Sequence, residues 1–256
     1  MSAILPLPTW RDEAWRYGDL KALEPVWPKL AGPEKIVVPA GEKLSRQIFE
    51  LPILDGTKDG VGIVDLDITI GDNAAFALHM LVSAAGYGRV QVKATLGKGA
   101  HFELGGAILG SGSQTLEIVT EVIHAEPNGT SNQVVRSVLA EKATGSFLGK
   151  VNVARNAQKT DAAQSVKAML LDRTATANAK PELEIFADDV KCAHGATVGE
   201  LDKQALFYMA SRGLPPEQAR KLMLHAFIAD AFVSMEDDAE RETAEHKALN
   251  LLENLL

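Results

Sequence analysis

The sequence has a single cysteine among 256 residues, and this scarcity limits the chemistry that it can support. One thiol excludes an internal disulfide framework and any metal site built only from this chain's own thiolates. Lysine and arginine form no cluster, and the formal net charge is −8, so we expect no nucleic-acid surface. No apolar run approaches the ~20 residues of a membrane-spanning helix.

Several signals of targeting and catalysis are also missing. The opening stretch MSAILPLPTW lacks the basic region and apolar run of a secretory signal, so we expect a soluble cytoplasmic protein. The glycine-rich run at 105–112 resembles a phosphate loop but lacks its lysine, and no Gly-x-Ser-x-Gly elbow occurs. The histidines outside the C-terminal motif show no metal-ligand spacing; they are His79, His101, His124, His225 and His246.

Short apolar-alternating runs dominate the middle of the chain, from about Ile36 to Ala193. They are separated by glycine-rich or polar turns, and they include 61–70, 90–96, 116–122, 134–140 and 146–153. The expected turns are 71–73, 86–88, 97–99, 110–112 and 127–129. Such spacing predicts a β-sandwich, a barrel or a solenoid, and it does not choose among them. Residues 161–172 have a helix-like pattern, as an insertion or as part of a coil.

Helical segments are expected on both sides of this β-region, giving domains at 1–35, 36–198 and 199–256. A short helix near Arg11–Leu23 lies among aromatic residues that either pin the lead-in to the body or form a contact surface. A C-terminal helix spans 202–212, Pro215-Pro216 begin a second, and a third starts at Ser234. The expected apolar stripe of the second helix consists of Ala219, Leu222, Met223, Ala226, Phe227 and Val233.

The stretch 181–213 joins the β-region to these helices. Residues up to His194 alternate with strand period, Asp188-Asp189 marks a turn or bulge, and Gly195 and Gly199 loosen the backbone before the helix. Asp202 is the expected N-cap, and Gly213 is placed to end the helix. On a strand, Cys192 and His194 share a face and offer two metal-binding atoms. Without a function in metal binding, Cys192 would be a small buried apolar residue and His194 would make a local hydrogen bond.

The run LEIFADDVKCAHGATVGELDKQALFYMASRG, at 183–213, resembles the C-terminal signature of the SufD branch of the SufB/SufD family. The likeness continues through LPPEQARKLMLHAFIADAF and appears more weakly in LPTWRDEAWRYGDLKAL near the start. These proteins are scaffold subunits of the SufBCD iron–sulfur cluster assembly complex. The resemblance implies a right-handed parallel β-helix with a C-terminal helical subdomain. SufD chains are often longer before the β-region, which puts functions of that segment in doubt here.

The resemblance also implies roles for particular residues. His194 would be the transient metal ligand or proton-transfer group at the interface with SufB, and Cys192 ranks second. A glutamate follows the histidine in SufB-type chains, where Gly195 stands here, so this chain alone would hold no cluster. The C-terminal helices would dock the SufC ATPase, with Tyr208, Arg212, Arg220 and His225 facing it. Whether a flavin takes part stays open.

The sequence leaves two alternatives to this non-catalytic scaffold. A β-solenoid enzyme acting on carbohydrate or acyl groups would need acids aligned along one face, and the β-region offers no aligned carboxylate pair. A self-associating structural protein would pair the open edge of its β-helix with a second copy, giving a homodimer in isolation.

Overall fold

The computed structural model describes residues 6–30, 32–57, 60–83 and 86–255. The strands in these ranges are β1 (Glu34–Val38), β2 (Lys43–Ile48), β3 (Val61–Ile70), β4 (Ala75–Val82), β5 (Tyr87–Leu96), β6 (His101–Gly110), β7 (Thr115–His124), β8 (Thr130–Leu139), β9 (Thr144–Val153), β10 (Asp161–Leu170), β11 (Thr176–Ile185) and β12 (Lys191–Gly199). The helical segments are η1 (Glu13–Trp15), α1 (Leu20–Leu23), η2 (Trp27–Lys29), α2 (Lys203–Ser211), α3 (Pro216–Ala229) and α4 (Asp238–Glu253).

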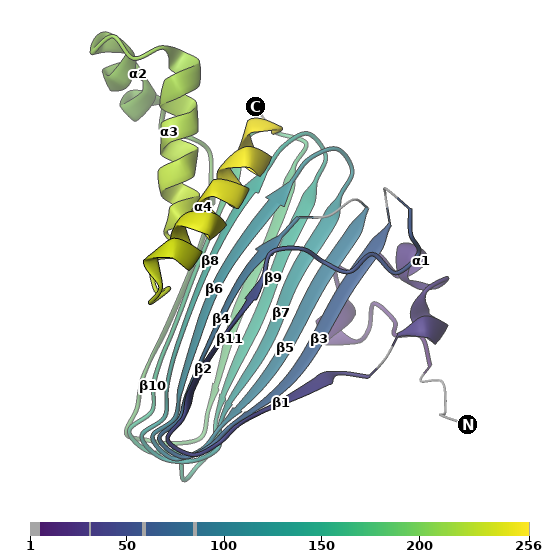
Figure 1. Cartoon of the computed structure of the whole chain (residues 1–256), viewed down its shortest axis with the longest axis vertical. Coiled ribbons are helices and arrows are strands. Elements are labelled where there is room, and N and C mark those ends of the chain that lie inside the picture. The colour runs from purple at the N-terminus through teal and green to yellow at the C-terminus, as the bar shows by residue number, and fades with distance from the viewer. Residues whose placement is uncertain (1–5, 31, 58–59, 84–85, 256) are drawn as a thin grey trace.

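The chain winds as a flattened parallel β-helix (Figure 1). Within the described ranges, the odd-numbered strands form one six-stranded sheet, in the order β1-β3-β5-β7-β9-β11. The even-numbered strands form a second, in the order β12-β10-β8-β6-β4-β2. Each coil contributes one strand to each sheet, and every pairing is parallel, for example Gln133 opposite Gln164. This topology confirms the β-helix and excludes the sandwich and the barrel.

Most strand predictions agree with the structure. The run 61–70 coincides with β3, and residues 161–172, whose pattern is helix-like, form β10 as part of a coil. The turn expected at 86–88 is wrong beyond its first residue, because Tyr87 and Gly88 already belong to β5 and pair with Thr115 and Leu116. The prediction of no secretory signal concerns a segment whose first five residues lie outside the described ranges.

One corner of the β-helix repeats a left-handed backbone conformation from coil to coil. The residues with positive φ at this corner are Gly41, Asn73, Gly99, Asn128 and Lys159. Their backbone N–H groups donate to a carbonyl of the next coil, as from Asn73 to Lys98 at 2.8 Å and from Asn128 to Gln158 at 2.9 Å. Glycine and asparagine tolerate this conformation best. The repeat therefore lies in backbone geometry and not in a fixed residue type.

The interior of the β-helix is a continuous apolar core that extends from Val38 to Ala187. In-register residues stack from coil to coil, as Phe76 does with Phe102, and both are almost fully buried. Each added coil buries its inward-facing apolar side chains against the coil before it. Burial of apolar surface stabilises the fold by roughly 25 cal/mol per Å², so the stacked coils stabilise one another.

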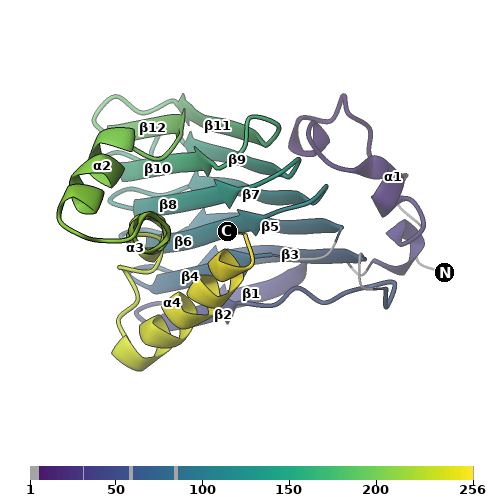
Figure 2. The ribbon, with the colours of Figure 1, turned by 90° about the horizontal axis from the view of Figure 1, so that it is seen from above.

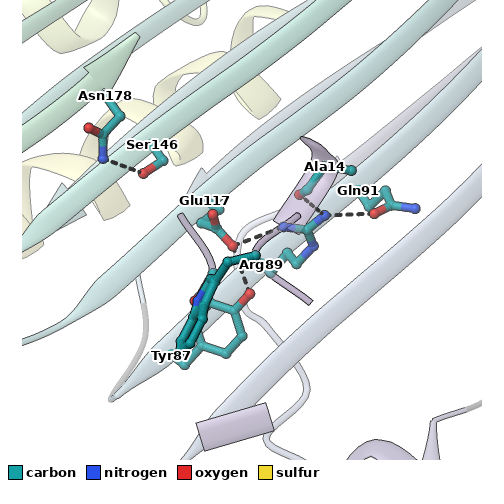
Figure 3. A network of polar contacts seen from close by, with 9 residues as sticks. Ala14, Tyr87, Arg89, Gln91, Glu117, Ser146 and Asn178 are labelled. Atoms are coloured by element: carbon teal, nitrogen blue, oxygen red, sulfur yellow. Dashed lines mark hydrogen bonds and ion pairs between the residues drawn. The ribbon is translucent and has the colours of Figure 1, made fainter. Parts of the chain in front are cut away.

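The N-terminal lead-in lies against the outer face of the odd-numbered sheet. The guanidinium of Arg89 lies 3.8 Å from the ring centroid of Trp15, and its Nη2 donates to the Ala14 carbonyl at 2.7 Å (Figure 3). Arg89 Nη1 and the Tyr87 hydroxyl both donate to Glu117 Oε2, at 2.9 and 2.7 Å. Trp15 and Trp27 thus pin the lead-in to the body, as expected, whereas Trp10 is 60% exposed.

The lead-in is not the single helix expected over Arg11–Leu23. It forms η1 and α1 separately, because Gly18 interrupts the run and Asp19 starts a new helix. The Asp19 carboxylate accepts hydrogen bonds from the backbone N–H groups of Lys21 and Ala22, at 3.1 and 3.0 Å. Such N-capping favours a fresh helix start over continuation.

Helices α3 and α4 cover the outer face of the even-numbered sheet (Figure 1). Asp202 caps α2, accepting from Gln204 N at 2.8 Å, and Gly213 has φ +88° just after it, as expected. Pro216 is the first residue of α3, also as expected. None of the helices in the described ranges is long and apolar enough to cross a membrane.

Two details of the C-terminal helices differ from expectation. The stripe expected on α3 is only partly right: Ala219 is fully buried and Phe227 packs against the core, whereas Leu222 and Val233 are 54% and 66% exposed. Leu224 and Ile228, which lie outside that stripe, are fully buried. Apolar side chains lie on several faces of α3, and contact with the sheet selects the buried one. Helix α4 starts at Asp238 rather than near Ser234, because Asp237 is its N-cap and accepts from Glu240 N at 2.9 Å. Ser234 Oγ lies 2.9 Å from His79 Nε2.

Candidate functional site

Cys192 and His194 both lie on β12, the last strand of the even-numbered sheet (Figure 2). Cys192 is in register with Ala162 and His194 with Gln164, both on β10. The strand continues through Gly195 to Gly199, so the expected loosening at these glycines is wrong. The register with β10 keeps the backbone extended, and an added Cβ at either glycine would meet no atom within 4 Å.

The two side chains differ in burial. Cys192 is half-buried and packs against the interior core, whereas His194 is exposed. Strand alternation puts His194 on the same side of β12 as Cys192. The imidazole is exposed there because no further coil covers this end of the β-helix within the described residues. The open end thus presents a histidine to whatever covers it.

The thiol of Cys192 is less suited than the His194 imidazole to bind a metal ion. Burial raises the pKa of Cys192, and a backbone hydrogen bond at Ala162 offsets part of that rise. A raised pKa lowers the thiolate fraction, and the thiolate is the form that attacks electrophiles and binds metals. His194 is therefore the better candidate of the two for an early contact with metal.

The chain does not assemble a metal site by itself in the part that the structure describes. No group of three or more His, Cys, Asp and Glu side chains there is arranged to hold a metal ion. Two donors on one strand leave a tetrahedral ion incomplete. Any iron at His194 must take its remaining ligands from another molecule.

Exposed apolar side chains gather where the last coil ends. Ile185 and Phe186 close β11 and are 39% and 58% exposed, and Val198 on β12 is 48% exposed. β11 and β12 each pair with one strand only, so each leaves a row of backbone groups free at its outer edge. An uncovered edge with large apolar residues is typical of an interaction surface. The motif did not point to Phe186, although its position just after a strand could have done so.

The four residues expected to face SufC lie on two helices. Tyr208 is on α2 and 58% exposed, and Arg212 follows it with its guanidinium 5.1 Å from the Tyr208 ring centroid. Arg220 and His225 are on α3 and half-buried. The most exposed large apolar side chain is Phe207 on α2, at 76%, which sequence reasoning missed.

Helix α2 stands apart from the body of the molecule. It has no buried residue, and it projects above the ends of the strands (Figure 1). Helix α3 is fixed to the sheet by Arg136 on β8, whose Nε and Nη2 donate to Asp230 Oδ2 at 2.8 and 2.6 Å. Arg136 Nη1 also donates to the Ser165 carbonyl on β10, at 2.7 Å. The helical region is thus linked through β10 to the strand that carries His194.

Comparison with known proteins places this architecture in a family. A family model described as "SUF system FeS cluster assembly, SufBD core domain" matches residues 53–227, more than half of the chain. The chain belongs to the SufBD family. The matched range includes β3 to β12, all of α2 and most of α3, and therefore every candidate residue of the last coil and the helices.

Curated relatives point to the SufD branch of the SufBD family. The chain is 38% identical over 112 residues to "Iron-sulfur cluster assembly protein SufD" of Escherichia coli, covering 44% of this chain and 26% of the relative. It is 32% identical over 133 residues to the protein of the same name from Bacillus subtilis, covering 52% and 30%. "Protein ABCI7, chloroplastic" of Arabidopsis thaliana is 36% identical over 140 residues, covering 54% and 30%. The matches thus span under a third of these relatives' length.

Proposed function

We propose that this chain is a non-catalytic scaffold subunit for iron–sulfur cluster assembly. It pairs with a SufB-type partner through the last coil and docks a SufC-type ATPase through α2 and α3, and ATP hydrolysis belongs to that ATPase. The observation that carries the proposal is the unfinished last coil, which exposes His194 and, elsewhere along the same coil, Ile185, Phe186 and Val198.

In this proposal His194 acts at the end of the β-helix that the partner covers. The partner extends or covers the β-helix end, desolvating the imidazole and bringing the missing ligands within reach. His194 then binds iron transiently, or moves a proton, while the partner supplies a thiolate and a carboxylate. The cluster is cargo shared between the two chains. Cys192, half-buried and with a raised pKa, lies beside this site and contributes after His194.

Helix α2 suits the second partner because none of its residues is fully buried and Phe207 and Tyr208 are exposed. Phe207 and Tyr208 supply apolar and aromatic surface, and Arg212 supplies a charge. Aromatic and arginine side chains are the commonest energetic centres of protein interfaces. Movement of the docked ATPase would reach β12 through α3, the Arg136–Asp230 pair and β10.

The deciding experiment uses the chain co-expressed with SufB and SufC from the same source. His194→Ala should leave the three-chain complex intact and lower the rate of cluster formation, measured by absorbance of the iron–sulfur chromophore. His246→Ala is the matched control, because His246 is an exposed histidine on α4. Normal cluster formation in the His194→Ala complex would contradict the role of His194.

Two surface variants separate the partner surfaces. Phe186→Asp should abolish co-purification with SufB and spare SufC, whereas Phe207→Asp should do the reverse. Loss of both partners from one variant that still folds would show that the surfaces are assigned wrongly.

The homodimer remains a second candidate for the chain without partners, because β11 and β12 leave free edges that a second copy can pair with. Size-exclusion chromatography with light scattering would detect it, and Phe186→Asp should dissolve it. A cavity of about 580 Å³ beside β2, β4 and β6 is where an enzyme would place its site. Its buried groups already bond neighbours, as His79 does with Ser234 and Glu103 with Asn132, so the scaffold is favoured.

A further inference from the structure

A column of polar side chains leads through the interior of the β-helix to His194. Gln133 on β8, Gln164 on β10 and His194 on β12 occupy equivalent positions in three successive coils. The neighbours of Gln164 at two-residue spacing, Ala162 and Val166, belong to the interior core. The glutamine side chains therefore point inward, and they are 0% and 3% exposed for Gln133 and Gln164.

The two glutamines differ in how they are bonded. Gln133 Oε1 accepts a hydrogen bond from Thr120 Oγ1 at 2.7 Å, and only its Nε2 is without a partner. Neither amide atom of Gln164 has a hydrogen-bond partner in the structure. A buried amide with both atoms unpaired destabilises the folded state, and an apolar side chain of the same shape would not. Packing alone therefore does not explain a glutamine at this position.

Two residues of the last coil lie over Gln164 and the neighbouring Gly149, and of these two His194 alone has a polar side chain. Its Nε2 extends toward Gly149 on β9, where an added Cβ would lie 2.6 Å away. The absence of a side chain at Gly149 thus makes room for the amide. In the last coil, Pro181 stands over Gly149 and His194 over Gln164. Proline has no backbone N–H to offer, whereas the imidazole is both a donor and an acceptor.

We propose that Gln164 is a positioning residue for His194, an inference that rests on the function proposed above. When the ring turns inward over β10, Gln164 Oε1 accepts a hydrogen bond from one imidazole N–H. The other ring nitrogen then keeps its lone pair and faces the open end, where iron or a proton arrives. A carbonyl oxygen behind a metal-binding histidine fixes its tautomer and orientation in the same manner. The unpaired amide finds its partner in the ring that it orients.

Nitrogen NMR of the isolated chain with 15N-labelled histidine tests this directly. At one fixed pH, the two ring-nitrogen shifts of His194 should show one dominant tautomer in the natural sequence. Gln164→Leu should move them toward the averaged values of a free imidazole. Gln133→Leu is the matched control, since the same change one coil deeper should leave the His194 signals in place. If Gln164→Leu does not fold, Gln164→Met retains the length of the side chain without its polar atoms.

Unchanged His194 signals in a folded Gln164 variant would overturn the proposal, as would an equal change in Gln133→Leu. In the complex with SufB and SufC, Gln164→Leu should slow cluster formation about 10–100-fold, the usual effect of losing such a support. The NMR result does not depend on the partners. A shifted tautomer together with normal assembly by His194→Ala would keep Gln164 as a positioning residue and reject the proposed function.

Discussion

Strands β6 and β12 belong to the same parallel sheet and have opposite burial. Both are parallel strands in one sheet, yet β6 buries every residue except His101 and β12 buries none. The difference comes from their neighbours in the sheet, because β6 is paired between β4 and β8 while β12 is paired with β10 alone. The comparison teaches that the pleat and register of a β-helix persist where burial stops. The last coil therefore has ordered strands whose outer side is not covered by another coil in the described residues.

Ion pairs repeat this contrast. The Arg89–Glu117 pair in the central coils is fully buried, with both side chains at 0% exposure. The Lys150–Glu184 pair joins β9 to β11 and is 41% and 46% exposed. Their separations are similar, at 2.9 and 2.6 Å, so any difference in energy comes from the surroundings.

The largest effect is expected from breaking the buried pair. Glu117→Gln should lower the free energy of unfolding by about 3–5 kcal/mol, because it leaves the buried Arg89 charge without its counterion. Glu184→Gln, the matched change near the last coil, should cost about 0–1 kcal/mol, since water screens the exposed pair. Urea unfolding of both variants measures this. Equal losses would contradict the difference in burial between the two pairs.

The pH dependence of stability should come partly from the interior. Burial lowers the pKa of His124, on β7, from its ordinary 6.5 to about 4. The unfolded chain therefore binds this proton first as pH falls, and stability is lost between pH 6.5 and 4, by about 3 kcal/mol in all. His124→Asn should flatten that slope, and His246→Asn, at an exposed position, should not. Identical slopes in the natural sequence and His124→Asn would contradict the buried neutral imidazole.

The smallest effect concerns two glycines in the same sheet. An added Cβ at Gly105 on β6 would lie 2.0 Å from the Ala231 carbonyl oxygen, whereas Gly195 on β12 has no atom within 4 Å of that position. Gly105→Ala should therefore destabilise by about 1–3 kcal/mol by lifting the end of α3 from the sheet. Gly195→Ala should be neutral or stabilise by about 0.5–1 kcal/mol. Thermal unfolding distinguishes the two, and a large loss at Gly195 would show that the last coil is packed.

Local sequence patterns were enough to predict most strands and the helix starts at Asp202 and Pro216. Alternation fixes a strand such as β3 without help from distant contacts. The corner repeat was invisible, because glycine, asparagine and Lys159 all occupy its left-handed position. The buried face of α3 was also beyond reach, since Leu222 and Leu224 are equally apolar and contact with the sheet decides between them.

The candidate site likewise has residues that the sequence predicted and residues that it did not. The motif pointed to His194 and Cys192, and strand period placed them together. Gln164 was missed because its segment has a helix-like pattern, and because its relation to His194 depends on register between strands that are separated by β11. The exposure of Phe186 and Phe207 likewise depends on which other segments pack against them, and local sequence does not encode this.

Amide hydrogen exchange of the chain with and without the SufB-type partner tests the central claim most directly. Partner binding should slow exchange at the free edge formed by 185–186 and 191–199, where backbone N–H groups gain a cover or a new strand. The coils around β1 and β2, at the opposite end of the stack, should exchange as before (Figure 2). Protection at β1 and β2 with none at β12 would contradict the claim that the last coil is completed by another chain.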